Sequence, residues 1–191
     1  MAADLPGFYA YRRRLPHFRA AGATYFVTWR LYPGQPDLDS GERSAVVLAV
    51  RHFDGQRYDL SGFVVMNDHV HLLLRPQAGF TLERILHSLK SFTARTLQKT
   101  TGRVGRIWQD ESFDRVVRSE DEYLEKLEYV VNNPRKRWPE TTVYPWVWVA
   151  DRASREISTG TLLLPVEAGT EAGPTCQLDA TPAAPAAGVQ G

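Results

Sequence analysis

The sequence has very little cysteine: Cys176 is the single one in 191 residues. A lone cysteine cannot close an internal disulfide, and it gives no signal of a zinc or redox motif. Long apolar runs are also missing, since no stretch approaches the roughly 20 residues that cross a bilayer. The first residues carry Asp4 and then Arg12, Arg13 and Arg14, without the pattern of a secretory signal. We therefore expect a cytoplasmic protein with no membrane partner.

Net charge is nearly absent too, because 23 Lys and Arg residues face 22 Asp and Glu residues, which leaves +1. Any attraction to nucleic acid must then come from a local basic surface. A hydrophobic content of 43% suits one compact domain. Composition divides the chain into a basic and aromatic arm (1–20), a domain (21–150), a short extension (151–164) and a tail (165–191). The tail has no basic or aromatic residue, so we expect it to be disordered.

Hydrophobic periodicity predicts strands at 24–31, 58–66, 69–75 and 112–118. One helix is expected from a cap at Ser40 to Gly55, and a second from a cap at Thr81 to about Gly102. The buried stripe predicted for the second helix is Leu82, Ile85, Leu86, Leu89, Phe92 and Leu97. This β-α-β-β-α-β order is typical of an α+β, ferredoxin-like antiparallel sheet with two helices on one face. The other face is expected to stay free for ligand chemistry.

Two histidines, His69 and His71, open the third predicted strand. Alternate residues of a strand point to the same face, so Asn67, His69, His71, Leu73 and Arg75 share one mostly polar face. Two imidazoles side by side on an open face are placed to bind one metal ion. The alternative is a pair of ordinary surface histidines.

A further helix is predicted to begin at a capping box formed by Ser119 and Glu122 and to close at Pro134. Its apolar stripe is expected to hold Tyr123, Leu124, Leu127, Val130 and Val131. Tyr129 falls about 160° from that stripe, and Asn133 follows it by one turn on the same outward face. A metal held by His69, His71 and the Asn133 oxygen, beside Tyr129 as nucleophile, suits phosphodiester cleavage. A surface aromatic and a helix stop signal are the simpler interpretations of Tyr129 and Asn133.

These motifs together resemble the REP-associated tyrosine transposases, relatives of the single-strand insertion-sequence transposases in the HUH (His-hydrophobic-His) superfamily. The segments that carry the resemblance are 25–28, 65–72, 89–93, 107–109, 113–115 and 128–134. It implies Mg²⁺ or Mn²⁺ and the cleavage of single-stranded DNA beside a hairpin of the REP type. The protein is then expected in the bacterial cytoplasm, associated with the nucleoid. The products would be a 5′-phosphotyrosine and a free 3′-hydroxyl. The protein is expected to be a monomer or a homodimer. Tyr129, His69 and His71 match the family's catalytic positions, and Asn133 stands where related enzymes often carry a glutamine ligand.

Basic residues that could contact the DNA phosphates occur in the arm, on the second helix and around the last helix. They are Arg12, Arg13, Arg14, Lys90, Arg95, Arg115, Arg118, Arg135 and Lys136. The arm could equally be a loosely packed extension, and the aromatic segment 138–150 could pack as a strand or stack on bases. Two other functions remain open: a hairpin-binding protein without chemistry, and a zinc hydrolase in which water attacks.

Overall fold

The computed structural model describes residues 9–12, 16–19 and 22–150, so Arg13, Arg14 and the segments 151–164 and 165–191 lie outside the described residues. The described elements are β1 (Tyr9–Arg12), β2 (Pro16–Arg19), β3 (Tyr25–Arg30), α1 (Ser40–His52), β4 (Tyr58–Val65), β5 (His69–Pro76), α2 (Leu82–Thr101), β6 (Phe113–Val116), α3 (Glu120–Arg137) and β7 (Val147–Val149). None of the helices in these ranges has the length and apolarity that a bilayer crossing requires.

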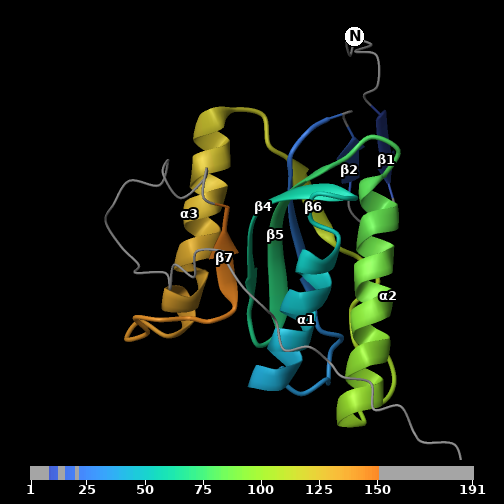
Figure 1. The fold of residues 1–191 in the computed structure, drawn as a ribbon, viewed down its shortest axis with the longest axis vertical. Helices are drawn as coiled ribbons and strands as arrows, with labels where there is room; N and C mark the ends of the chain where they lie inside the picture. Colours follow the sequence, from blue (N-terminus) through green and yellow to red (C-terminus); the bar gives the residue numbers. More distant parts are fainter. Residues whose placement is uncertain (1–8, 13–15, 20–21, 151–191) are drawn as a thin grey trace, which may run out of the picture.

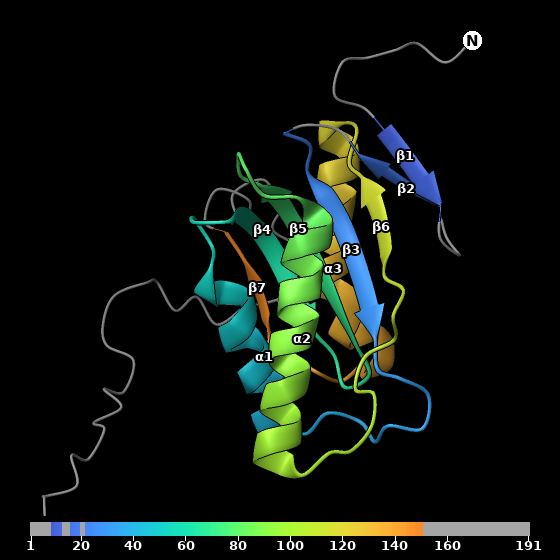
Figure 2. The same cartoon turned by 90° about the vertical axis from the view of Figure 1, so that its right-hand side faces the viewer.

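The main sheet has five strands in the order β6-β3-β5-β4-β7, and all of its pairings are antiparallel. Its first four strands come from the predicted β-α-β-β-α-β unit, so the α+β, ferredoxin-like prediction is confirmed. Helices α1 and α2 lie on one side of this sheet and α3 on the other (Figure 1). A turned view places β1 and β2 beside β6, as a separate two-stranded sheet (Figure 2).

The larger core lies between the sheet and helices α1 and α2. It buries Tyr25, Val27 and Trp29 of β3 and the apolar stripe of α2. Thr81 caps α2, and Gly102 ends it in the left-handed conformation (φ 71°), both as predicted. Phe92 was wrongly placed in the stripe, because it is 55% exposed.

Thr93 occupies the core position that was predicted for Phe92, since it lies four residues after Leu89 on the same helix face. Its hydroxyl donates to the Leu89 carbonyl and accepts a hydrogen bond of 2.9 Å from the Trp108 indole nitrogen. A buried polar residue with satisfied hydrogen bonds therefore completes this stripe.

The opposite face of the sheet is not free, contrary to the prediction. Helix α3 covers much of it, and Leu127 and Val130 pack there with Leu73 in a second core. Strand β7 adds to β4 at the sheet edge, and the Tyr144 hydroxyl donates to the Val65 carbonyl. The aromatic segment 138–150 thus forms a packing strand, which was one of its two interpretations.

The cap of α1 differs from the prediction by one residue. Asp39, rather than Ser40, is the N-cap, and it forms a reciprocal capping box with Glu42. The Asp39 carboxylate accepts from the Glu42 amide, and the Glu42 carboxylate accepts from the Asp39 amide. An Asp with Glu three residues later is as good a capping pair as the predicted serine.

The two ends of α3 also differ from the prediction. Ser119 caps the Glu122 amide as expected, but the Glu122 carboxylate reaches back to the Arg118 amide instead of Ser119. Pro134 does not close the helix, which continues to Arg137 with the proline inside it. A proline lacks one helical amide donor but still offers its carbonyl as an acceptor. The Trp138 amide donates to the Pro134 carbonyl, so helical hydrogen bonding continues past the proline.

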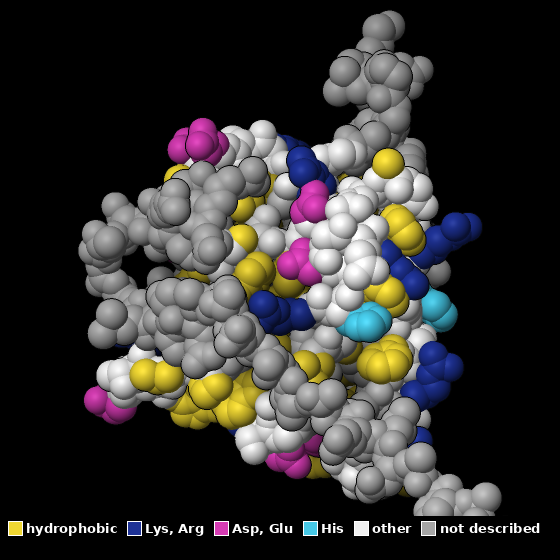
Figure 3. Space-filling model, viewed as in Figure 1, with side chains coloured by type: hydrophobic (Ala, Val, Ile, Leu, Met, Phe, Trp, Pro, Cys, Tyr) yellow, Lys and Arg dark blue, Asp and Glu magenta, His cyan; other side chains and the backbone are white. Residues whose placement is uncertain are grey.

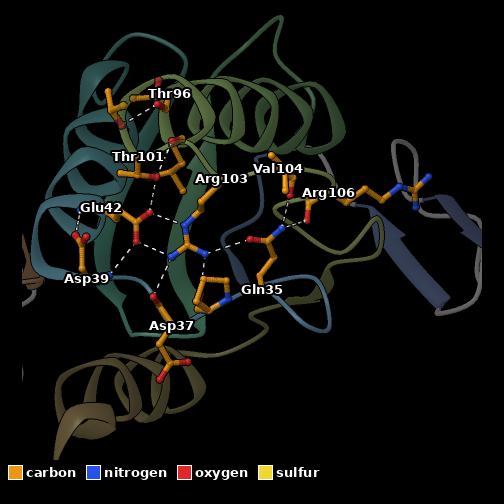
Figure 4. A network of polar contacts seen from close by, with 12 residues as sticks. Gln35, Asp37, Asp39, Glu42, Thr96, Thr101, Arg103, Val104 and Arg106 are labelled. Carbon is orange, nitrogen blue, oxygen red and sulfur yellow. Dashed lines mark hydrogen bonds and ion pairs between the residues drawn. The ribbon is translucent and has the colours of Figure 1, made fainter.

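A buried ion pair joins the start of α1 to the loop after α2 (Figure 4). The Arg103 guanidinium meets both carboxylate oxygens of Glu42, at 2.5 and 2.6 Å, and the two side chains are only 6% and 3% exposed. Arg103 also donates to the carbonyls of Pro36 and Asp37, so one side chain fixes the loop before α1. The hydrogen bonds from Arg103 hold the pKa of Glu42 at about 2 although burial alone would raise it.

Replacing Glu42 by Gln should lower the free energy of unfolding by about 3 kcal/mol near neutral pH, because the Arg103 charge is left buried without its counterion. Gln at this position can still close the capping box, so the change isolates the charge. The pKa of Glu42 is about 2 in the fold and 4.5 ordinarily. Its stabilisation is therefore complete above pH 4.5 and is lost as the pH falls toward 2.

Denaturant unfolding of the parent and Glu42→Gln between pH 7 and 2 measures this. The difference in unfolding free energy should shrink on acidification, because protonated Glu42 resembles Gln. Glu140→Gln, at an exposed position, is the control and should track the parent at every pH. A difference that stayed constant with pH would contradict the ion pair as its cause.

Asp37 connects this network to the histidine motif and to α3. Its carboxylate accepts a hydrogen bond from the Asn67 amide, one residue before Asp68 and two before His69. The same oxygen lies 3.9 Å from Arg137 in the last turn of α3. The turn that precedes the histidine strand is thereby linked to the loop before α1 and to the last helix.

Candidate active site

The pairing of β3 with β5 sets the positions around the two histidines. Thr28 lies directly opposite His71, and Arg30 lies directly opposite His69. Residues opposite each other on antiparallel strands point to the same face. The four side chains therefore stand together on the face that α3 partly covers.

Each histidine has its Nδ1 atom engaged by a neighbouring oxygen. His71 Nδ1 lies 2.7 Å from the Thr28 hydroxyl, and His69 Nδ1 lies 2.7 Å from the Asp68 carboxylate. The two rings are 4.6 Å apart between centroids. His71 Nε2 is buried, and no described residue gives it a hydrogen bond. Metal-binding histidines commonly use one ring nitrogen for the metal and tie the other to an oxygen, so the pair fits a metal.

His71 is held in its neutral form. The pKa of His71 is lowered to about 3, mainly because burial disfavours the charged ring, and further by electrostatic interactions with His69, Arg30 and Lys136. Neutral imidazole carries the lone pair that a metal ligand requires. His69 is more accessible, with its side chain 12% exposed.

Tyr129 does not point outward, contrary to the prediction. Its ring meets the His71 ring edge-on at 5.1 Å between centroids, and the Phe26 ring at 5.7 Å. The Lys136 ammonium lies 3.7 Å from the Tyr129 ring centroid. Tyr129 lies on the flank of α3 rather than on its apolar stripe, but its side chain is long enough to contact Phe26 and His71 on the sheet. The structure therefore brings the tyrosine and the histidines together.

Asn133 is also buried rather than outward, at 6% exposure, one helical turn after Tyr129. The adjacent Asn132 has a buried side-chain oxygen to which no described residue donates. Within the described residues, no group of three His, Cys, Asp or Glu side chains could hold a metal.

Comparisons with known proteins show what this chain is similar to. Residues 49–133, which contain both histidines and Tyr129, match the model of the family described as "Transposase IS200 like". The predicted resemblance to transposases of this kind is confirmed. No curated protein matches the chain.

Two solved structures are similar to this chain. One is described as the REP-associated tyrosine transposase bound to a REP hairpin; it has a TM-score of 0.53 and 21% identity, over 66% of this chain and 73% of that one. The other is a candidate transposase from Deinococcus radiodurans with a TM-score of 0.40 and 20% identity, over 69% of this chain and 97% of that one. The first similarity supports the fold.

The predicted DNA-contacting residues separate into two groups in the structure. Arg115, Arg118, Arg135 and Lys136 lie on or next to α3, on the histidine side of the sheet, whereas Lys90 and Arg95 lie on α2. Positive side chains over α2 line the right-hand edge of Figure 3. Lys90 donates to the Asp110 carbonyl and lines a cavity of about 820 Å³ beside α2. Arg12 belongs to β1.

Sequence reasoning missed several residues that hold the site together. Thr28, Asp68 and Phe26 contact the two histidine rings, and the Phe26 and His71 rings are stacked at 5.3 Å. The alternation Phe26, Thr28, Arg30 in a strand was a usable signal, because it places all three on one face. The register that brings them opposite the histidines cannot be obtained from one strand alone.

Proposed function

We propose that the protein is a metal-dependent endonuclease and strand transferase that acts on single-stranded DNA through Tyr129. The observation that supports this best is the edge-on contact of the Tyr129 and His71 rings at 5.1 Å, within one chain. A phenol beside two oriented imidazoles is the combination that tyrosine-mediated phosphodiester cleavage requires. Because both groups belong to the same chain, Tyr129 acts in its own subunit in this proposal.

His69, His71 and Asn133 would hold Mg²⁺ or Mn²⁺. The buried His71 Nε2, which has no hydrogen-bond partner among the described residues, supports this assignment. When bound, the ion supplies positive charge for the non-bridging oxygens of the attacked phosphate. Thr28 and Asp68 fix the two rings through their Nδ1 atoms, so that both Nε2 atoms are available.

The proposed reaction is one transesterification. The Tyr129 oxygen attacks phosphorus and forms a new P–O bond, while the bond from phosphorus to the 3′ oxygen breaks. The phenol proton is lost to solvent, and the departing 3′ oxygen takes up a proton. The products are a 5′-phosphotyrosine and a free 3′-hydroxyl. The same chemistry in reverse gives strand transfer: another 3′-hydroxyl attacks phosphorus and loses its proton, the bond from phosphorus to the Tyr129 oxygen breaks, and the phenol takes up a proton.

The proposed substrate is a single strand next to a REP-like hairpin, as in the similar structure bound to such a hairpin. Arg30 and Lys136 stand beside the histidines, as their effect on His71 indicates, and they would oppose phosphate charge. The protein would act in the cytoplasm at the bacterial nucleoid, as a monomer or homodimer.

The deciding experiment is incubation with hairpin oligonucleotides and Mn²⁺, followed by denaturing electrophoresis. A label on the fragment 3′ of the cleavage position should migrate with the protein, because that fragment carries the 5′ phosphate. A label on the other fragment should not. Binding without an adduct, for every hairpin tried, would support the alternative of a DNA-binding protein without chemistry.

Mn²⁺ should support adduct formation at a lower concentration than Mg²⁺. Magnesium prefers oxygen ligands, whereas two of the three proposed protein ligands are imidazole nitrogens. Titrating each ion into the metal-free protein and measuring the initial rate tests this, and excess chelator should stop the reaction. Equal half-saturating concentrations would argue against the two histidines as direct ligands.

A further inference from the structure

Three strands place an aromatic residue in the same row as the histidine site. Phe113 of β6 lies directly opposite Thr28 of β3, and Thr28 lies directly opposite His71 of β5. Neighbouring strands are about 4.8 Å apart, so the Phe113 backbone stands roughly 10 Å from that of His71. Paired residues share a face, and Arg115, two residues later, confirms which face this is by pairing with Glu122 of α3 at 2.6 Å.

Phe113 belongs to the part of this face that α3 leaves open. It is 49% exposed, whereas Phe26 in the next row is 6% exposed under α3. The exposed ring is bordered by cations on the same face, since the Arg30 side chain is 55% exposed and that of Arg115 is 54% exposed. An aromatic ring among accessible cations is the combination that single-stranded nucleic acid binds, through bases and phosphates respectively.

We propose that Phe113 is the stacking platform for a nucleobase that flanks the phosphodiester attacked by Tyr129. This inference rests on the proposed function and adds to it a base-binding subsite on β6. His71, Thr28 and Phe113 lie in one row across three strands. In this proposal the attacked phosphate lies at the His71 end of the row and the stacked base at the Phe113 end. Arg30 and Arg115 contact the backbone phosphates on either side of the stacked base.

A single-stranded base fits this surface better than an apolar protein partner would. The residues that pair with or flank Phe113 on this face include Thr28, Arg30 and Arg115, which are polar or charged. Stacking is tolerant of base identity, because every base presents a flat π surface. The subsite would therefore position the strand and contribute little to sequence choice.

The test uses full-length protein carrying Tyr129→Phe, so that DNA is bound without being cleaved. Hairpin oligonucleotides carry 2-aminopurine at successive single-stranded positions, and its fluorescence falls when the base stacks. The Tyr129→Phe protein with Phe113 intact, which is the parent in this test, should quench the fluorescence at one position. Adding Phe113→Ala should remove that quenching. Affinity for the unmodified oligonucleotide should fall roughly 5- to 150-fold. Phe113→Trp should retain both signals.

An abasic site at the quenched position gives the independent check. It should weaken binding by the Phe113 protein, while Phe113→Ala should bind intact and abasic oligonucleotides equally. Phe92→Ala is the matched control, because Phe92 is 55% exposed but lies on α2, across the sheet. Its affinity and quenching should equal those of the parent, and melting temperatures verify folding.

The outcomes separate the two proposals. If the parent binds hairpin oligonucleotides but Phe113→Ala changes neither affinity nor quenching, the subsite is overturned and the proposed function stands. Equal weakening of intact and abasic DNA by Phe113→Ala also overturns base stacking. If the parent binds no oligonucleotide, both proposals are overturned.

Discussion

Tyr129→Phe should bind hairpin DNA as tightly as the parent and form no covalent adduct. The substitution keeps the ring and its contacts with His71, Phe26 and Lys136, and it removes only the attacking oxygen. Stability should change by less than about 1 kcal/mol, since no buried group is left unpaired. The measurements are adduct yield on denaturing gels, affinity by fluorescence anisotropy, and the melting temperature.

Tyr123→Phe is the matched control, because Tyr123 packs against the same core from an earlier turn of α3. It should form the adduct at the parental rate. An adduct that persisted in Tyr129→Phe and vanished in Tyr123→Phe would assign the nucleophile to the other tyrosine. Loss of DNA binding in Tyr129→Phe would show instead that the phenol serves recognition.

His71→Ala should abolish metal-dependent cleavage and leave hairpin binding within a few-fold, because the ion acts mainly on the transition state. His71 is 4% exposed, stacks on Phe26 and holds the Thr28 hydroxyl. Its removal should therefore also lower the free energy of unfolding by about 1–3 kcal/mol. Cleavage assays must be run well below the melting temperature, so that unfolding does not account for the loss.

Metal binding itself separates the two effects of His71→Ala. Mn²⁺ should raise the melting temperature of the parent, since a ligand that binds only the folded state stabilises it, and should not raise that of the variant. His69→Ala should show the same loss of cleavage and metal response with a smaller loss of stability, because this ring packs less. Thr28→Val is a milder control, which keeps both ligands and removes one orienting hydroxyl. Undiminished cleavage by His71→Ala would remove the metal assignment.

The local elements of the fold were predictable because their signals are short-range. The capping threonine and terminal glycine of α2 and the alternation in β5 are written in a few consecutive residues. The histidine pair and Tyr129 were singled out from equally short motifs, although Tyr129 was expected to point outward. The exposure of Phe92 was missed because Phe92 is large and apolar and was therefore assigned to the buried stripe in place of Thr93. Adjacent helical positions differ in direction by about 100°, so the two residues face different sides of the helix.

The surroundings of the site were harder to predict because they depend on tertiary packing. The sequence shows that α3 has an apolar stripe, but it does not show which surface receives that stripe. Docking of α3 on the histidine face buries Asn133 and turns the flank that carries Tyr129 toward His71. The same docking covers one part of the sheet and leaves Phe113 open. Strand register, which places Thr28 beside His71, is likewise a property of two segments far apart in the sequence.

The contacts of Asp37 make it a spacer between the two halves of the site. Its carboxylate meets Asn67 at the histidine turn and lies near Arg137 at the end of the tyrosine helix, while its carbonyl is held by the core Arg103. The pair with Arg137 is exposed and contributes little to stability. Its effect is on alignment: small displacements of this loop would alter the separation of Tyr129 from the two histidines. Under the proposed function, the loop before α1 is therefore a place where substitutions far from the phosphate would change the cleavage rate without changing which DNA is bound.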